Sequence, residues 1–211
     1  MAALGIPTWR GRLHAWAFLG SIPAGLILVL AAERTAGRVA TAIYVISLAA
    51  MLGTSAAYHR LARSTRARRR MRRLDHSMIF VLIAGTYTPV CLLALPLAWG
   101  IPLLVAAWAM AALGVTFKAI GVERRIALVN ALYIVLGWAA IITLPAVIAS
   151  MPLLALVLMV VGGVAYTLGS IVLLRRRPDP RPAVFGFHEV WHACTLVGVV
   201  SHFAMVWRIA V

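Results

Sequence analysis

Long apolar runs follow one another along this chain of 211 residues and constrain its fold more than any other feature. A helix needs about 20 mainly apolar residues to cross the hydrocarbon core of a bilayer. A soluble fold is excluded because 64% of the residues are hydrophobic and only 12% are charged. The sequence therefore predicts an all-α, multi-pass protein of the cell (inner) membrane, folded as a single seven-helix domain over residues 1–211. The expected spans lie at about 13–31, 38–59, 75–95, 99–119, 126–144, 151–174 and 187–207.

The basic residues lie in short clusters between the apolar runs. The net charge of +15 does not indicate nucleic-acid binding, because nucleic-acid-binding proteins carry their charge on a polar, soluble surface. Of the 20 Arg and Lys residues, 17 fall at the N-terminus and in the second, fourth and sixth connections, Lys118, Arg124 and Arg125 among them. The positive-inside rule then places the N-terminus in the cytoplasm and the C-terminus outside. We expect membrane lipids as partners, no nucleic acid, and an oligomeric state that the sequence leaves open.

Two histidines at the start of the last span have the spacing of metal ligands. His188 and His192 are four residues apart, so their imidazoles project from one face of a helix. Glu189 between them completes H-E-x-x-H, a pattern in which two histidines bind zinc and the glutamate is a general base. The alternative is a pair of histidines at a helix end that are hydrogen-bonded to neighbouring loops.

A third ligand has to come from another helix, because no Asp or Glu follows His192. His59 ends the second predicted span, and the predicted topology places it on the same side of the membrane as His188. Three imidazoles would leave the fourth position of Zn²⁺ open for water, as catalytic zinc sites require. Other divalent metals could use the same ligands. We therefore expect a metal site at His59, His188 and His192.

Asp75 and Ser55 are the polar residues expected closest to that site. Asp75 opens the third predicted span beside an arginine cluster, where it could act as a base on the attacking water. Equally, it could pair with Arg72 or Arg73, or cap a helix. Ser55 lies one turn before His59, so its hydroxyl could contact an oxyanion or bond back to its own helix.

We expect that none of the remaining histidines and neither cysteine binds the metal. His76 points about 100° away from Asp75 and is expected outside the ligand set. His14 and His202 are expected to be buried, hydrogen-bonding histidines. Cys91 and Cys194 lie in apolar runs without a CxxC spacing, which indicates packing.

Three segments resemble the haemolysin III branch of the progestin and adipoQ receptor superfamily. They are S-x-x-x-H from Ser55 to His59, the stretch LDHSMIFVLIAGTYTP from Leu74 to Pro89, and HEVWH from His188 to His192. The SHF that begins at Ser201 follows on the last helix. Together with the seven-span layout, the resemblance covers essentially the whole chain.

This resemblance implies a seven-helix bundle with a zinc ion near its cytoplasmic face. The histidines that bind the metal in the family match His59, His188 and His192. The family's serine and its acidic residue match Ser55 and Asp75. The superfamily includes alkaline ceramidases, in which a zinc-activated water cleaves a lipid amide. Glu189 stands where receptor relatives carry other residues, which favours Asp75 as the base.

The sequence supports three functional hypotheses. The first is a zinc-dependent hydrolase of a lipid amide or ester, with the acyl chain held inside the bundle. The second is a non-catalytic sensor, receptor-like or haemolysin-type protein with a structural zinc. The third, an intramembrane protease, depends on H-E-x-x-H and ranks last, because the chain offers no further acidic ligand apart from Asp75. Neither the substrate nor the presence of catalysis follows from the sequence.

Overall fold

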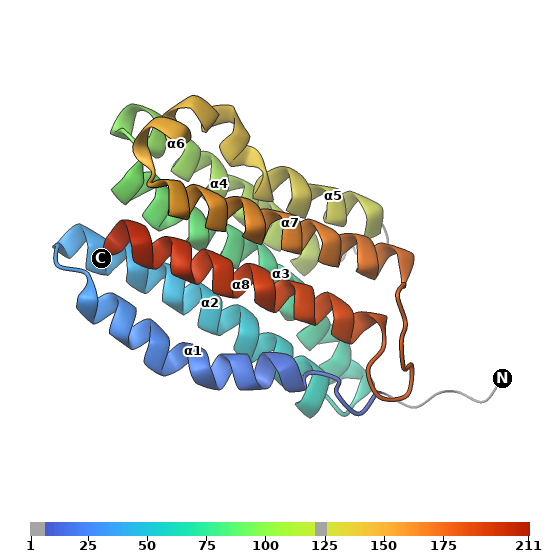
Figure 1. The fold of residues 1–211 in the computed structure, drawn as a ribbon. Helices are drawn as coiled ribbons and strands as arrows, with labels where there is room; N and C mark the ends of the chain where they lie inside the picture. The colour runs from blue at the N-terminus through green and yellow to red at the C-terminus, as the bar shows by residue number, and fades with distance from the viewer. Residues whose placement is uncertain (1–6, 121–125) are drawn as a thin grey trace.

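The computed structural model describes residues 7–120 and 126–211, and of residues 126–130 it describes only the backbone. All regular elements among these residues are helical, apart from one isolated bridge between Arg181 and Phe185. Seven spans of the described chain are long and apolar enough to cross a membrane, which confirms the predicted fold class. The elements, drawn in Figure 1, are α1 (Arg12–Ala31), α2 (Thr35–Leu61), α3 (Thr65–Pro89), a π-helical turn η1 (Val90–Ala94), α4 (Leu97–Ala119), α5 (Ile126–Gly137), a 3₁₀ turn η3 (Ala139–Thr143), α6 (Leu144–Ser150), α7 (Leu153–Arg175) and α8 (Phe187–Ala210).

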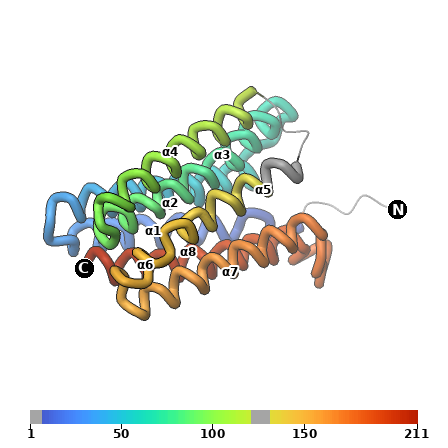
Figure 2. The backbone as a smooth tube through the Cα atoms, turned by 90° about the horizontal axis from the view of Figure 1, so that it is seen from above, coloured from blue at the N-terminus to red at the C-terminus, as the bar shows by residue number. Residues whose placement is uncertain are grey.

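The helices form one bundle in which α8 occupies a central place. Helices α1 to α4 pack as sequential neighbours, and α7 runs along α8 (Figures 1 and 2). Helix α8 also contacts α1, α2 and α3, so the first and last parts of the chain meet. We call the end where α1, α3 and α8 begin the arginine-rich end, because it carries the exposed arginines of the α2–α3 and α7–α8 connections. Its cytoplasmic location stays a prediction.

Helix α3 begins at Thr65, ten residues before the predicted start of the third span at 75. The Ser64 side chain caps it by accepting a hydrogen bond from the Ala67 backbone at 3.2 Å. The first turns are rich in exposed arginine, a good helix former. A search for apolar runs misses these turns, because their residues are helical but charged, and it therefore starts the span too late.

The fifth span is broken near its middle rather than continuous. Helix α5 ends at Gly137, a 3₁₀ turn follows, and α6 starts with Pro145 in its first turn. Breaking a helix inside a membrane frees backbone groups that need new partners. Tyr87 of α3 supplies them, since its hydroxyl donates to the Leu136 carbonyl at 3.0 Å and accepts from the Ala140 amide at 2.9 Å.

Glycines allow several helices to approach closely. A Cβ on Gly53 of α2 would lie 2.9 Å from the Phe18 ring of α1, and one on Gly162 of α7 would collide with the His202 imidazole of α8. Small residues at such contacts are the usual means of helix packing in lipid. Large apolar side chains such as Trp16 and Ile142 are about 70% exposed, as expected for a surface that faces lipid.

Candidate metal centre

Three histidines meet at the arginine-rich end of the bundle. His59 comes from the last turn of α2, while His188 and His192 come from the first turns of α8. One imidazole nitrogen of each lies within 4.8 Å of those of the other two. The Nε2 atoms of His59 and His188 are 3.2 Å apart. The structure therefore brings together the three residues that the sequence analysis names as ligands.

The unsatisfied nitrogens of this cluster fit a metal ion. A single shared proton could satisfy His59 and His188, but the Nε2 atom of His192 is buried without a hydrogen-bond partner among the described residues. Two nitrogens at about 2.1 Å from a tetrahedral zinc ion lie about 3.4 Å from each other, close to the separation of the His59 and His188 nitrogens. Because imidazole suits zinc and several other transition metals, the donor set is compatible with Zn²⁺.

The segment before α1 closes over this cluster. The Thr8 and Trp9 amides donate to the carbonyls of Ala183 and Val184, each at 3.2 Å, which ties the segment to the connection before α8. Gly11 then takes a φ of 74°, and a Cβ there would lie 2.6 Å from the His59 Cβ. Only glycine combines this left-handed backbone with so close an approach.

Both carboxylate oxygens of Glu189 have hydrogen-bond partners in the protein, which does not suit a general base. Oε1 pairs with the Arg10 guanidinium at 2.6 Å, and Oε2 accepts from the amide of the N-cap residue Gly186 at 2.9 Å, which is the glutamate half of a capping box. Glu189 is 1% exposed. Its part of H-E-x-x-H therefore serves the start of α8 and the anchoring of Arg10.

His14 connects Ser55 with the histidine cluster. Its Nδ1 atom lies 2.8 Å from the Ser55 Oγ, and its ring stacks on that of His192, with 3.9 Å between centroids and 1° between planes. The Ser55 hydroxyl is thus bonded to a residue of the neighbouring helix α1. The prediction of a buried, hydrogen-bonding His14 is confirmed, but no motif in the sequence indicated that it lies beside the cluster.

Asp75 is buried in the third turn of α3, 5% exposed and next to Ser55. A helix-capping role for Asp75 is wrong, because α3 begins ten residues earlier and Ser64 caps it. Arg73, one of the proposed ion-pair partners, donates to the Ala119 carbonyl at 3.4 Å. Pairing of Asp75 with Arg72 or Arg73 stays a prediction.

A cavity of about 350 Å³ begins beside these residues and continues into the bundle. Its polar end is lined by His14, Ser55, Asp75 and His76. Along α3 and into η1, the lining extends from Asp75 to Val90, which is about 22 Å of helix. The cavity therefore covers most of the thickness of a hydrocarbon core, about 30 Å.

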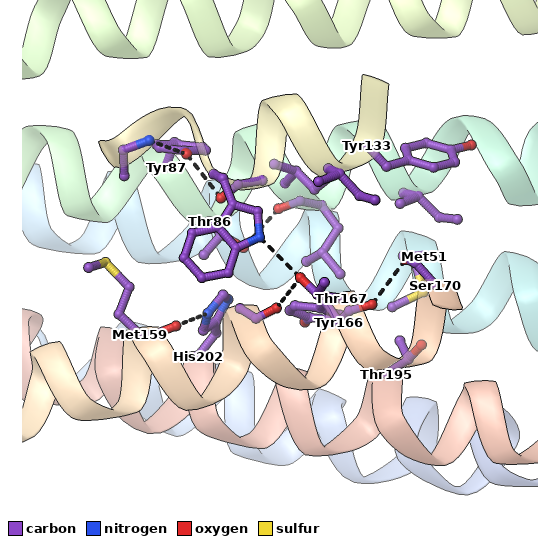
Figure 3. A pocket seen from close by; sticks show the side chains of 18 of the residues that line it. Met51, Thr86, Tyr87, Tyr133, Met159, Tyr166, Thr167, Ser170, Thr195 and His202 are labelled. Carbon is purple, nitrogen blue, oxygen red and sulfur yellow. Dashed lines mark hydrogen bonds between the residues drawn. The ribbon is translucent and has the colours of Figure 1, made fainter. Parts of the chain in front are cut away.

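Beyond its polar end, the cavity is mainly apolar. Figure 3 shows this part, with Met51, Thr86, Tyr166 and His202 among the side chains that surround it. His202 is bonded to the Met159 carbonyl at 3.2 Å, so the prediction of a hydrogen-bonding histidine is confirmed there, but its side chain is half-buried at the cavity and not fully buried as predicted. A long, apolar cavity with polar groups at one end suits a ligand with a hydrocarbon chain.

Lys118 is a candidate functional residue that the sequence analysis missed. The sequence analysis groups Lys118 with the arginines of the connections, whereas the structure buries it in the last turn of α4, 6% exposed. It lies 3.1 Å from the Nδ1 atom of His76, which is outside the histidine cluster, as predicted. A lysine at the end of an apolar run looks like a surface cation until the packing is known. Arg124 and Arg125, from the same count, lie outside the described residues.

Known proteins resemble this chain over nearly its full length. The family described as "Haemolysin-III related" matches residues 4–203. A "Hemolysin-3 homolog" of Bacillus subtilis (strain 168) is 32% identical over 193 residues, which cover 90% of this chain and 87% of the relative. A "Hemolysin-3" of Bacillus cereus is 31% identical over 195 residues, with 90% and 85% covered.

Proposed function

Because this chain belongs to the haemolysin III family of membrane proteins, we propose that it is a zinc-dependent hydrolase of a lipid amide or ester. One observation carries the proposal: three imidazoles, one with a buried nitrogen that lacks a partner among the described residues, lie next to His14, which stacks on His192 and lines one end of an apolar cavity. The three imidazoles do not themselves line the cavity, whose near end also carries a carboxyl group and a hydroxyl group. A metal site, a base and a lipid-sized cavity are the parts that such a reaction requires.

The histidines would hold the ion, and the neighbouring side chains would handle the proton and the substrate. Zinc, when bound to His59, His188 and His192, supplies Lewis acidity that makes water acidic near neutral pH and polarises a carbonyl group. Asp75 takes the proton of the attacking water and passes it to the departing amine or alcohol. The C–N or C–O bond of the lipid breaks, and a fatty acid leaves.

Ser55 and His14 orient the reacting groups. The Ser55 hydroxyl lies between the His14 imidazole and Asp75. Its single hydrogen can donate to the Asp75 carboxylate and turn to the developing oxyanion once Asp75 has taken the proton of the water. His14, held flat against His192, fixes the direction of that hydroxyl. The acyl chain extends along the apolar lining from Asp75 towards Val90, which leaves the scissile bond at the polar end.

The test combines metal content with turnover. Detergent-purified wild type and His188→Ala are analysed for bound metal, and both are then assayed for fatty acid released from a panel of ceramides and acyl esters. About one zinc per chain, lost in His188→Ala, together with turnover that Asp75→Ala abolishes, is the expected result. His202→Ala is the matched control for metal content, since it removes another histidine of the same helix but leaves the three imidazoles intact; because His202 lines the cavity, it is not a control for turnover.

Two other outcomes discriminate between the hypotheses. Zinc without turnover on any lipid would favour the sensor or receptor-like alternative, in which the ion only joins α2 to α8. Absence of metal from the wild type would overturn the shared site. Full turnover in Glu189→Gln would exclude the protease hypothesis, because that mechanism needs Glu189 as its base.

A further inference from the structure

Three consecutive arginines at the end of α7 surround a hollow on the protein surface. Arg175, Arg176 and Arg177 line it together with Ile171 and Asp179. All three arginines are exposed, and none of their guanidinium groups has a hydrogen-bond or ion-pair partner among the described residues. The protein thus brings three positive charges to one hollow and leaves them without an anion of its own.

Asp179 does not neutralise this charge. Its Oδ1 atom accepts a hydrogen bond from the Phe187 amide at 2.8 Å, which commits the carboxylate to the start of α8. The C-terminal end of α7 adds about half a negative charge. Three guanidinium charges exceed these two contributions, so the hollow is positive. Guanidinium groups bind phosphate through paired, charge-assisted hydrogen bonds.

Arg176 occupies a backbone position that favours glycine. Helix α7 ends there, with a φ of 54° at Arg176 in the left-handed region. Residues with a side chain seldom adopt this conformation, and glycine is the usual residue where a helix ends in it. Because glycine would end the helix at least as well, the turn itself does not explain the arginine.

An apolar surface leads from α7 to the hollow. Leu168, Ile171 and Leu174 lie at three-residue intervals and are 53%, 38% and 61% exposed. Helix α7 is long and apolar enough to cross a membrane and ends at Arg175, which places the arginines at the level of the lipid headgroups. A phosphate in the hollow would therefore have its acyl chains beside an apolar helix face.

We infer that this hollow binds the phosphate group of an anionic phospholipid, whose acyl chains lie against Leu168, Ile171 and Leu174. The inference goes beyond the proposed function, because none of these residues belongs to the histidine cluster or lines the cavity. The bound lipid would hold the connection to α8, whose Ala183 and Val184 carbonyls anchor the segment before α1. The competing explanation is that the arginines only fix the orientation of the chain in the membrane.

Lipid binding by the detergent-purified full-length chain tests the inference. Native mass spectrometry counts bound dioctanoyl phosphatidylglycerol, with dioctanoyl phosphatidylcholine as the lipid without net charge. Inorganic phosphate and glycerophosphoglycerol, the headgroup without chains, are added as competitors. Wild type is compared with Arg176→Gln/Arg177→Gln and with Arg69→Gln/Arg70→Gln, which removes two adjacent, exposed arginines from the first turns of α3 and changes the net charge equally.

We expect wild type to bind phosphatidylglycerol saturably and more tightly than phosphatidylcholine. An arginine at an anionic headgroup contributes about fivefold in affinity, so Arg176→Gln/Arg177→Gln should weaken binding by about 25-fold. The α3 pair should change it by less than about twofold, because attraction by distant charges is screened. Equal weakening by both pairs, equal binding of the two lipids, or competition by the free headgroup or phosphate at the concentration of the lipid would overturn the inference.

Two further variants separate this site from folding and from the metal centre. Arg176→Gly relieves the left-handed backbone, so its melting temperature should equal or exceed that of wild type while its phosphatidylglycerol affinity falls about fivefold. Undiminished affinity in Arg176→Gly would overturn the inference. His188→Ala should bind the lipid like wild type, so loss of the proposed metal centre leaves this result intact.

Discussion

Glu189 accepts two hydrogen bonds that both stabilise the start of α8. In Glu189→Gln the amide oxygen can still accept from Gly186, but the charge that pairs with Arg10 is lost. Arg10 is 23% exposed and can be partly rehydrated, so we expect a loss of about 1–3 kcal/mol in unfolding free energy. Metal content should be unchanged. Denaturation in detergent and metal analysis check both statements, and Asp179→Asn, at the exposed cap of Phe187, is the control. Loss of metal in Glu189→Gln would contradict this role.

The bond between His14 and Ser55 predicts energetic coupling. His14→Phe keeps an aromatic ring beside His192 but removes the nitrogen 2.8 Å from the Ser55 hydroxyl, and Ser55→Ala removes the other partner. Since either change breaks the same bond, the double variant should be less destabilised than the sum of the singles, by about 0.5–1.5 kcal/mol. Unfolding in detergent gives the three values. Pairing His14→Phe with Thr116→Ala on α4 is the control, and its effects should add. Additivity in the first pair would show that the bond contributes nothing.

The positions of single residues in the fold could be predicted where their spacing along the sequence places them on one helix face or at one end of the bundle. The four-residue separation of His188 and His192, with His59 at the end of another span, indicated the cluster that the structure assembles. His14 and Lys118 could not be placed, because one begins an apolar run and the other ends one, without a motif around either. Whether such a residue faces its neighbours or the solvent depends on how the helices are rotated, which a sequence does not state.

At the scale of helices, the contact between α7 and α8 predicts a sharp difference between two glycines. Gly162→Ala would force the His202 ring aside and disturb its bond to the Met159 carbonyl. We expect a loss of about 1–3 kcal/mol, typical of overpacking. Gly20→Ala on α1 meets no atom within 4 Å and should be neutral or up to about 1 kcal/mol stabilising. Melting temperatures in detergent test the pair, and equal effects would contradict the close packing described.

The number of spans was predictable from hydropathy, but two of their outlines were not. The first turns of α3 are helical and charged, so a search for apolar residues starts the span ten residues late. The break in the fifth span depends on Tyr87, which lies about 50 residues earlier in the sequence and reaches the freed backbone groups only in the folded bundle. Local composition cannot report a hydrogen bond between distant segments.

At the scale of the whole molecule, the histidine cluster joins α2 to α8, so an ion held there should stabilise the bundle. A ligand bound only to the folded state at 100 times its Kd adds about 2.7 kcal/mol. Chelation should therefore lower the melting temperature of wild type to that of His188→Ala, whose own melting temperature should not respond to the chelator. Calorimetry or nephelometry in detergent, with metal content measured in parallel, makes the comparison. A wild type that loses its ion without any change in melting would contradict it.

The orientation in the membrane is a further property of the whole chain. The arginine-rich end should face the cytoplasm, because the exposed arginines of two connections would otherwise have to cross the bilayer. With seven spans, a periplasmic reporter enzyme fused after Val211 should be active and a fluorescent protein fused there should be dark. Fusions to the N-terminus provide the opposite controls. The reverse pattern would invert the topology.

The distance along the chain between the clustered histidines has a consequence for biogenesis. His59 and His188 are 129 residues apart, and six candidate spans of the described chain precede α8. While the first six spans are being inserted, no complete set of three imidazoles exists. An ion bound by all three imidazoles could therefore be held only after α8 has been made and packed against α2. Under the proposed function, the centre would report that these two distant helices have joined, which a quality-control system that distinguishes loose helices from a closed bundle could use.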